Sequence, residues 1–253
     1  MGEVWAIVVA GGSGSRFGDA APKQFQELAG LRLIDWALAA AGAACDGVVA
    51  VLPAAHLDAV PALNGEVGAG PGRFAGADRR ARPIAPAGGD SEAGFSGRPV
   101  VVAAGGPTRS ASVRAGLAAV SAEAEVIVVH DAARPLATAA LFERVVAAVR
   151  AGADGAVPGL PVSDTIKVVD PASGQVVETL DRPGLRAIQT PQAFSAAVLR
   201  RAHESGGDAT DDAALVEAAG GRVVVVDGEP ANLKITGPDD LVRAELLLTR
   251  RSL

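Results

Sequence analysis

Short runs of apolar, β-branched residues alternate along this chain with longer stretches of helical composition, and this alternation constrains the fold most. The short runs predict buried strands at residues 4–10, 48–52, 100–103, 126–130 and 222–226. The longer stretches predict helices at residues 33–41, 112–120, 141–150, 196–205 and 238–250. Such an alternation is typical of a mostly parallel twisted sheet with helices on both faces. We therefore predict a Rossmann-like α/β fold that binds its ligands at the carboxyl ends of the strands.

Two segments depart from this alternation. Residues 62–98 are dominated by Gly, Ala, Pro and Arg without a hydrophobic period, which predicts a flexible surface insertion. Residues 162–188 contain two runs of strand character around the turn at 170–174, which predicts a protruding β-hairpin arm. Because 253 residues can bury one sizeable core, we expect a single domain over 1–253 that carries both excursions.

The charge balance limits the partners of the chain. A formal net charge of -6 and a pI of about 5.1 provide no positive field that would attract nucleic acid or an anionic membrane. The apolar run 4–10 is too short to span a bilayer and follows Glu3, so we expect neither a membrane segment nor a signal peptide. Cys45 is the only cysteine, which excludes an internal disulfide. We expect a cytoplasmic protein whose phosphate chemistry depends on a few local cations.

A glycine-rich loop at residues 10–18 directly follows the first predicted strand. Glycines let backbone N–H groups approach phosphate oxygens without obstruction by Cβ atoms. The loop is not a dinucleotide fingerprint, because Phe17 stands where a small residue is needed, and it lacks the Gly-Lys-Ser/Thr of a Walker loop. Arg16 and Lys23 bring two cations to the same region. These residues alone are compatible with a polyphosphate site and with a solvated glycine turn.

Several motifs in a fixed order resemble one enzyme family. They are Gly11-Gly12-Ser13-Gly14-Ser15-Arg16, Pro22-Lys23-Gln24, Gly105-Gly106-Pro107-Thr108-Arg109-Ser110-Ala111-Ser112-Val113, His130-Asp131-Ala132-Ala133-Arg134-Pro135, Pro161-Val162-Ser163-Asp164-Thr165, Asp181-Arg182, Thr190-Pro191-Gln192 and Asn232-Leu233-Lys234-Ile235-Thr236. The first two resemble the signature loop of the sugar-phosphate nucleotidyltransferases, and the whole set resembles the 2-C-methyl-D-erythritol 4-phosphate cytidylyltransferase family. The resemblance covers nearly the whole chain apart from residues 62–98. It implies a nucleotide-diphospho-sugar transferase type of fold.

The resemblance implies a reaction in which the phosphate of 2-C-methyl-D-erythritol 4-phosphate attacks the α-phosphorus of CTP. The products would be 4-diphosphocytidyl-2-C-methyl-D-erythritol and pyrophosphate, in non-mevalonate isoprenoid biosynthesis. A phosphate monoester is largely dianionic at pH 7, so the attack needs no general base. The difficulty is the meeting of two anions, and the resemblance implies Mg2+ and a set of catalytic cations that neutralise them. This catalytic set is Arg16, Lys23, Arg182 and Lys234.

The resemblance also implies two sets of binding residues. The nucleotide-binding set is Ala10, Gly11, Gly12, Ser13, Gly14, Gly106, Arg109, Ser112 and Ala132. The substrate-binding set is Asp131, Arg134, Thr165, Arg182 and Thr190, with Asp131 also expected as a ligand of the metal. Relatives exchange the β-arm between two subunits. This implies a homodimer with shared active sites, in which Thr165 and Arg182 reach the substrate phosphate of the partner subunit.

Other interpretations are open at this point. Asp131 fits a helix N-cap equally well, and Arg182 fits a surface ion pair. Thr210 is compatible with a place on the substrate side of the site but fits a helix N-cap at least as well, so it stays outside the catalytic set. A ribitol 5-phosphate cytidylyltransferase would carry similar loops. A non-catalytic nucleotide-sugar binding module would keep the fold without turnover, but it would be expected to lose the cations that contact the triphosphate, and the chain has kept them.

Overall fold

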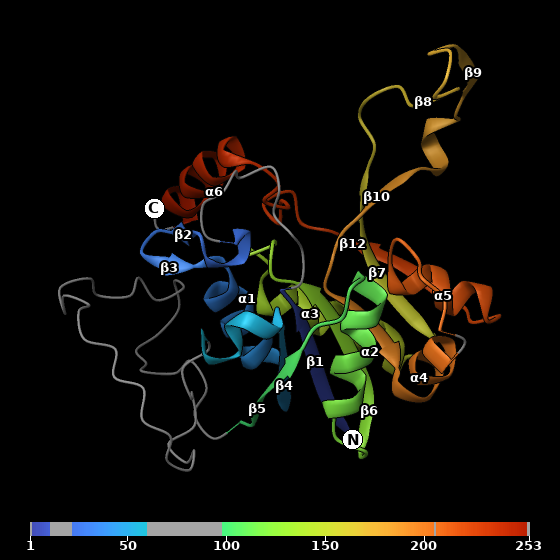
Figure 1. Cartoon of the computed structure of the whole chain (residues 1–253). Coiled ribbons are helices and arrows are strands. Elements are labelled where there is room, and N and C mark those ends of the chain that lie inside the picture. Colours follow the sequence, from blue (N-terminus) through green and yellow to red (C-terminus); the bar gives the residue numbers. More distant parts are fainter. Residues whose placement is uncertain (1, 11–21, 60–97, 205, 252–253) are drawn as a thin grey trace.

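The computed structural model describes the chain except for residues 1, 11–21, 60–97, 205 and 252–253. Nearly all of the predicted insertion at 62–98 therefore lies outside the described residues, as does most of the glycine-rich loop. In the described part of the chain, an eight-stranded mixed sheet forms the centre of the molecule (Figure 1). Its strands are β1 (Glu3–Val9), β4 (Gly47–Leu52), β5 (Val100–Ala104), β6 (Ala124–Asp131), β7 (Gly155–Pro161), β10 (Arg186–Ile188), β11 (Gln192–Ser195) and β12 (Val223–Asp227).

The order of the strands places the ends of three parallel strands side by side. The order is β10-β7-β11-β6-β1-β4-β5, and β12 pairs with β7. The strands β6, β1, β4 and β5 run parallel, whereas β11 is antiparallel to both β6 and β7. In the register, Val9 at the end of β1 lies opposite Val51 of β4 and Asp131 of β6. The carboxyl ends of these strands therefore form one edge, where the sequence predicts ligands to bind.

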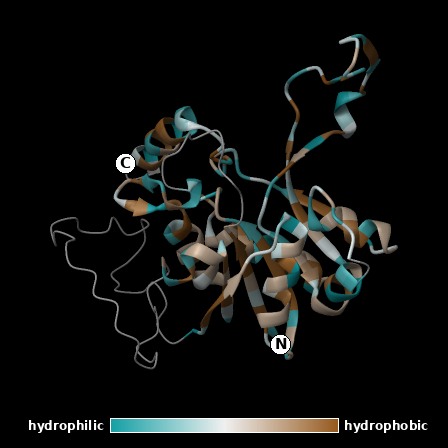
Figure 2. Cartoon of the chain, viewed as in Figure 1, coloured by the Kyte–Doolittle hydropathy of each residue, from teal (hydrophilic) through white to brown (hydrophobic). Residues whose placement is uncertain are grey.

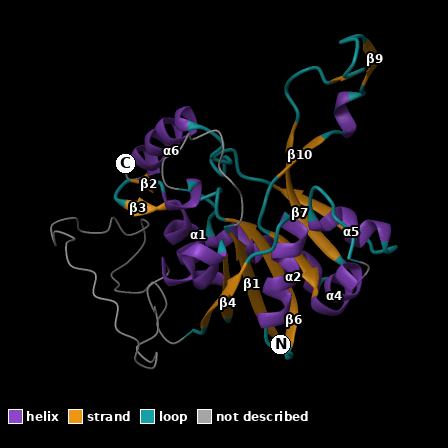
Figure 3. Ribbon diagram, viewed as in Figure 1, coloured by secondary structure: helices purple, strands orange, loops and turns teal. Residues whose placement is uncertain are grey.

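Helices cover both faces of the sheet, as the alternation of sequence predicts (Figure 3). Side chains of β1 alternate between two buried clusters, so that Val4 belongs to one and Trp5 to the other. The first cluster is completed by α1 (Leu33–Ala44) and α3 (Ala139–Arg150). The second is completed by α2 (Arg109–Ala119), α4 (Ala196–Glu204) and α5 (Asp212–Ala218). From Val4 to Val9 every residue of β1 is apolar, because both faces of the strand are buried.

A third, smaller cluster lies beside the main sheet. It includes Leu28, Leu33, Leu136, Ile235 and Ala244. These residues join the hairpin of β2 (Glu27–Leu28) and β3 (Leu31–Arg32) to α6 (Pro238–Arg251). Two 3-10 helices, η2 (Lys23–Phe25) and η3 (Ala54–Ala59), complete this side of the molecule. None of the described helices is long and apolar enough to cross a membrane.

The predicted hairpin arm is present and stands away from the sheet (Figure 1). It consists of the antiparallel pair β8 (Lys167–Val169) and β9 (Val176–Thr179), followed by the 3-10 helix η4 (Arg182–Gly184). The strand β9 is hydrophobic although nothing in the described part of the chain covers it (Figure 2). Val176 and Val177 are 52% and 67% exposed. A two-stranded hairpin with apolar side chains in water is marginally stable by itself, so the arm is suited to pack against another surface.

The predicted strands and helices are all present, and each of their ends lies within three residues of the predicted position. The sequence analysis did not predict β2, β3, β7, β10, β11 or α5 as separate elements. The missed strands matter, because β10 and β11 flank a segment that lines the candidate site.

Candidate active site

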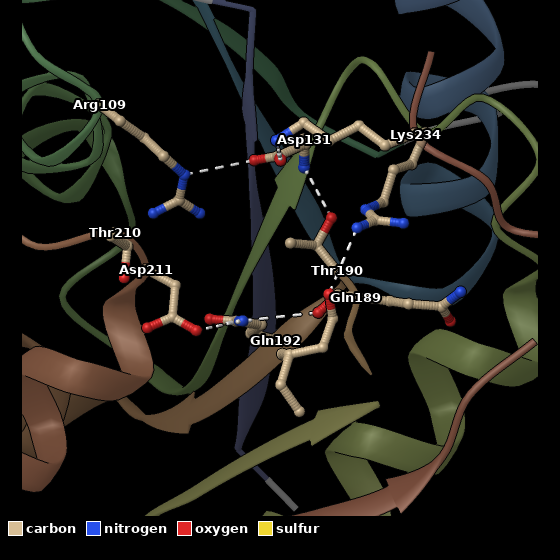
Figure 4. Close-up of a pocket in the computed structure, with 10 residues that line it drawn as sticks. Arg109, Asp131, Gln189, Thr190, Gln192, Thr210, Asp211 and Lys234 are labelled. Carbon is tan, nitrogen blue, oxygen red and sulfur yellow. Dashed lines mark hydrogen bonds and ion pairs between the residues drawn. The ribbon is translucent and has the colours of Figure 1, made fainter. Parts of the chain in front are cut away.

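A pocket of about 190 Å³ opens at the carboxyl end of β6 (Figure 4). Its walls come from the start of α2, the end of β6, the link between β10 and β11, the loop before α5 and the loop before α6. The lining residues are Arg109, Asp131, Arg134, Ile188, Gln189, Thr190, Gln192, Thr210, Asp211 and Lys234. Three cations and two carboxylates face this space, so the pocket is suited to a ligand that carries negative charge.

Asp131, the last residue of β6, is the centre of this charge cluster. Lys234 donates from Nζ to Asp131 Oδ2 at 2.8 Å, and Arg109 donates from Nε to Asp131 Oδ1 at 3.3 Å (Figure 4). Burial opposes ionisation of the carboxyl group, but Arg109 and Lys234 outweigh it and hold the pKa of Asp131 well below its usual range. Asp131 is therefore ionised at neutral pH. It does not act as a helix N-cap, because Thr138 caps the following helix α3.

A chain of hydrogen bonds fixes the turn that follows β6. The backbone N–H of Asp131 donates to Thr190 Oγ1 at 3.0 Å, and the Thr190 hydroxyl lies 3.1 Å from His130 Nδ1. His130 Nε2 lies 3.1 Å from the carbonyl oxygen of Arg134, which can only accept, so Nε2 donates and Nδ1 accepts. This pattern requires a neutral imidazole. Burial lowers the pKa of His130 to about 4, even though the charge of Asp131 acts in the opposite direction.

Buried amides fix the segment that carries Lys234. Asn232, which is fully buried, donates from Nδ2 to the carbonyl oxygen of Thr190 at 2.9 Å. The carbonyl oxygen of Asn232 accepts from Arg134 Nη1 at 2.8 Å. Gln189 donates to the carbonyl oxygen of Glu229 at 2.9 Å. These bonds tie the loop before α6 to the link between β10 and β11, so Lys234 and Thr190 enter the pocket from positions that are fixed relative to each other.

The turn between β5 and α2 is held closed by Ser112. Its hydroxyl donates to the carbonyl oxygen of Thr108 at 2.9 Å, and its Oγ accepts from the N–H of Gly106 at 3.2 Å. A Cβ atom on Gly106 would lie 2.5 Å from the Cβ of Ala111, so this close turn requires glycine. The turn brings Arg109, the first residue of α2, to the edge of the pocket. Ser112 itself is buried and engaged within the turn.

The structure brings one group of the sequence-predicted residues together and separates another. The pocket contains Arg109, Asp131, Arg134, Thr190 and Lys234. Ala10 and Ala132, from the predicted nucleotide-binding set, lie at the adjoining strand ends. The backbone N–H of Ala10 donates to the carbonyl oxygen of Val51, and that of Ala132 donates to the carbonyl oxygen of Val9. Lys23 begins η2 and does not line the pocket as described. The remaining members of the loop set, Gly11, Gly12, Ser13, Gly14 and Arg16, lie outside the described residues.

Thr165 and Arg182 are not part of this pocket. Both are exposed on the arm, where Arg182 donates to the carbonyl oxygen of Ser163. The pocket as described is formed without them.

Four of the pocket residues, Ile188, Gln189, Gln192 and Asp211, had no role predicted from the sequence. Thr210 lines the pocket, whereas the N-cap of α5 is Asp211, whose side chain accepts from the N–H of Ala214. Of the two interpretations of Thr210, the N-cap is therefore wrong by one residue, whereas a place at the pocket agrees with the structure. Gln192 also lines the pocket and donates to Asp211 at 3.1 Å. The Thr-Asp-Asp run is the signal that could have identified this loop, because polar residues before a helix are often presented to a ligand.

The side chains of the pocket can hold a metal ion only if a bound phosphate supplies further oxygen ligands. Among the described residues, no group of three His, Cys, Asp or Glu side chains is arranged to hold a metal. Asp131 offers one carboxylate, and both of its oxygens also accept from cations. Mg2+ is commonly held by one or two carboxylates together with substrate phosphates and water. Asp131 is therefore compatible with a magnesium ion that arrives with a polyphosphate.

Comparison with known proteins identifies related sequences over nearly the whole chain. A family model described as "IspD: 2-C-methyl-D-erythritol 4-phosphate cytidylyltransferase" matches residues 4–250. The chain is 42% identical over 250 residues to the 2-C-methyl-D-erythritol 4-phosphate cytidylyltransferase of Rhodococcus opacus (strain B4), and the match covers 98% of this chain and 96% of the relative.

Two further similarities concern the length and the fold. The chain is 42% identical over 247 residues to the bifunctional enzyme IspD/IspF of Clavibacter michiganensis, where the match covers 96% of this chain and 54% of the relative. The chain thus spans about half the length of the bifunctional relatives. The crystal structure of 2-C-methyl-D-erythritol 4-phosphate cytidylyltransferase from Thermus thermophilus matches with a TM-score of 0.68 and 33% identity, covering 98% of this chain and 100% of that one.

Proposed function

The chain belongs to the 2-C-methyl-D-erythritol 4-phosphate cytidylyltransferase family, and from this premise we propose that it joins CTP to 2-C-methyl-D-erythritol 4-phosphate. The products are 4-diphosphocytidyl-2-C-methyl-D-erythritol and pyrophosphate, and the reaction belongs to the non-mevalonate route to isoprenoid precursors. The observation that carries this proposal is the convergence of Arg109, Arg134 and Lys234 on one pocket around the ionised Asp131. A site that must bring two phosphate-bearing molecules together needs this excess of fixed positive charge.

The chain's own residues act by binding and by stabilising charge. The attacking phosphate is already a dianion near pH 7, so the neutral His130 behind the pocket has no proton to remove from it. Lys234 lies beside Asp131 and is 44% exposed, so its ammonium group can reach an oxygen of the α-phosphate where charge develops. Arg134 donates to the carbonyl oxygen of Asn232, two residues before Lys234, and its guanidinium lines the pocket for the substrate phosphate.

Mg2+ is proposed as the cofactor, with Asp131 as a protein ligand. When bound, the ion would neutralise the phosphate oxygens and orient them for in-line displacement. Asp131→Asn tests this assignment, because it keeps the shape of the side chain and removes the charge. We expect the variant to need a much higher Mg2+ concentration for half-maximal activity. An unchanged Mg2+ dependence and unchanged turnover would remove Asp131 from the metal site.

The glycine-rich loop is proposed to bind the triphosphate of CTP. Its members Gly11, Gly12, Ser13, Gly14 and Arg16 follow β1, whose end lies next to Asp131 in the sheet. Lys23 is proposed to act with Arg16 on the leaving pyrophosphate. Gly106, Ser112 and Ala132 are proposed to contact the cytidine part of the nucleotide.

A homodimer with shared active sites is proposed as the working form. The observation that supports it is the arm itself, whose strand β9 exposes Val176 and Val177 beyond the sheet. Thr165 and Arg182 lie on the same arm and away from the pocket of their own chain. In a dimer that exchanges arms, both residues would reach the substrate phosphate in the pocket of the partner subunit. A cytoplasmic location stays a prediction from the sequence.

Release of pyrophosphate by purified protein tests the function. CTP, UTP, GTP and ATP are each combined with 2-C-methyl-D-erythritol 4-phosphate or ribitol 5-phosphate in the presence of Mg2+. We expect release only from CTP with methylerythritol phosphate. Release with ribitol phosphate would keep the chemistry and change the substrate. If no pair releases pyrophosphate, the chain is a nucleotide-binding module without turnover.

A further inference from the structure

Arg109 is held from behind the pocket by a carboxylate that does not line it. Asp212, the first residue of α5, is fully buried, and its Oδ2 accepts from Arg109 Nη1 at 2.7 Å. The same guanidinium reaches Asp131 from Nε at the longer distance of 3.3 Å. Arg109 thus bridges two carboxylates, and its shorter bond is to the one outside the pocket. A shorter, charge-assisted bond in a buried setting determines the orientation of the group.

A second contact fixes Asp212 itself. His203 of α4 lies with Nε2 3.0 Å from Asp212 Oδ1, and because an ionised carboxylate only accepts, the imidazole donates. The side chain of His203 is buried, and its Nδ1 has no hydrogen-bond partner in the part of the chain that the structure describes. Both oxygens of Asp212 are therefore engaged in a dry environment. Rotation of this carboxylate would leave a buried polar group without its hydrogen bond, which is unfavourable.

The remaining N–H groups of Arg109 are directed by this anchor. A guanidinium is planar, so fixing Nη1 against Asp212 also sets the directions of Nε and Nη2. Nη2 has no partner among the described residues. Burial opposes the charge of Arg109, but Asp212 first and Asp131 second raise its pKa, so the cation is maintained. Arg109 therefore holds one donor without a partner in the described structure and one weakly engaged donor on the side of the pocket.

We propose that Asp212 is a positioning residue, which with His203 behind it sets the direction in which Arg109 offers Nε and Nη2 to the bound nucleotide. On binding, Arg109 exchanges its 3.3 Å contact with Asp131 for an oxygen of the ligand and keeps its 2.7 Å contact with Asp212. The two roles are separable, because the contacts use different nitrogens. This inference rests on the proposed cytidylyltransferase function of the pocket.

A double-mutant cycle tests the proposal with kcat/KM of pyrophosphate release as the readout. Asp212→Asn keeps the shape and removes the charge that holds Arg109. We expect kcat/KM to fall roughly 10- to 100-fold, which is the effect of misplacing a binding group by about 1 Å. In an Arg109→Met background the same substitution is expected to change kcat/KM by less than about twofold, because its target is gone. Equal losses in both backgrounds would show that Asp212 acts independently of Arg109, and would overturn the proposal.

Two further variants keep the test decisive. Asp35→Asn breaks an Arg–Asp pair of the same 2.7 Å length on α1, outside the pocket, and is expected to leave kcat/KM unchanged. His203→Gln retains a donor near the position of Nε2, whereas His203→Met removes it. We expect the Met variant to lose activity and the Gln variant to retain most of it. In the Arg109→Met background, we expect neither His203 substitution to change the kcat/KM of the Arg109→Met protein. If Asp212→Asn does not fold, the His203 pair decides the question by the same criterion.

Failure of the inference can be told from failure of the proposed function. A wild-type protein that releases no pyrophosphate with any substrate pair contradicts the function. If the wild-type protein is active but the losses of kcat/KM from Asp212→Asn and Arg109→Met multiply in the double variant, only the positioning role is contradicted.

Discussion

At the scale of single residues, the pocket combines charges that are fixed by different neighbours. Asp131 accepts from Lys234 and Arg109, yet each cation also has its own support, from the loop before α6 and from Asp212 respectively. The cations therefore keep their places when a phosphate competes for them. This preorganisation is what makes fixed charges effective, because no reorganisation is needed as the reaction proceeds.

Lys234→Met is expected to abolish most of the turnover. The substitution keeps much of the length of the side chain and removes the ammonium group nearest to Asp131. We expect kcat to fall about 100-fold or more, corresponding to roughly 3 kcal/mol of barrier. The measurement is pyrophosphate release at saturating substrates. Arg243→Met is the control, because Arg243 is also paired with a carboxylate, Asp240 at 3.9 Å, on the exposed surface of α6. Full turnover by Lys234→Met would exclude Lys234 from the chemistry.

Cys45 is expected to be unreactive in the folded protein. It is buried at the end of α1, and burial together with the nearby Asp46 raises the pKa of its thiol to about 12. Because the thiolate is the reactive form, iodoacetamide at a mildly alkaline pH should modify the native protein far more slowly than a free thiol. After denaturation in urea, mass spectrometry should show a single alkylation per chain, since the sequence has one cysteine. Rapid modification of the native protein would contradict this burial.

The same pKa makes stability depend on pH above neutrality. The folded thiol stays protonated up to about pH 12, whereas the unfolded thiol ionises above about pH 9. The unfolded state therefore loses a proton first, and the free energy of unfolding should fall as the pH rises through this window, by about 1.4 kcal/mol per pH unit. A Cys45→Ala variant lacks this contribution. Its urea unfolding curves, measured from about pH 8 to about pH 10 across the ordinary thiol pKa, should shift less than those of the wild type.

The residues of the site could be predicted where a motif surrounds them, and not where only the fold brings them together. Asp131 and Lys234 are 103 positions apart and were both predicted, because each lies in a recognisable run at a strand end or loop. Asp212 ends the Thr-Asp-Asp run at the start of α5, but nothing in that run or around His203 indicates that the two side chains pair, because the pairing depends on how α4 packs against α5. Whether a buried polar residue is a ligand contact, a cap or a support is decided by its neighbours in space.

At the scale of elements, close packing of α2 against the sheet depends on a glycine. A Cβ on Gly116 would lie 2.5 Å from Ile7 Cγ2 and 3.1 Å from Val51 Cγ2, both in the buried core. Gly116→Ala should therefore lower the free energy of unfolding by about 1–3 kcal/mol, although alanine favours a helix by about 1 kcal/mol. Thermal or urea unfolding measures this. Ala118→Gly, on the exposed side of the same helix, should lower the free energy of unfolding only by the difference in helix propensity, about 1 kcal/mol. A Gly116→Ala protein that is more stable would mean that α2 lies farther from the sheet.

The same scale shows why some elements escaped prediction. Hydrophobic runs identified β1, β4 and β6, which are buried on both faces, and hydrophobic periodicity identified long helices such as α1 and α3, which bury one face. β7 reads as a loop, since its seven residues include two glycines and two prolines. β10 and β11 have three and four residues, too few for a period to be visible. These strands exist because β6, β7 and β12 provide partners for their hydrogen bonds, which a local pattern does not record.

At the scale of the whole molecule, the arm is the element whose apolar side chains are left uncovered by the described part of its own chain. Its valines are exposed, it stands away from the sheet, and two of the residues that are predicted to contact substrate lie on it rather than in the pocket (Figure 1). Exchange of arms between two copies would cover the valines and complete both pockets at once. Symmetric exchange also means that each active site contains Lys234 from one chain and Arg182 from the other.

This arrangement predicts complementation between two inactive variants. In a heterodimer of Lys234→Met and Arg182→Met chains, one site contains both substitutions and the other contains neither. Random exchange of subunits makes about half of the dimers mixed, so the mixture should recover about a quarter of wild-type activity. A mixture of Lys234→Met and Arg109→Met is the control, because both residues line the pocket of one chain and every mixed site keeps one defect. Recovery in both mixtures, or in neither, would contradict an active site shared through the arm.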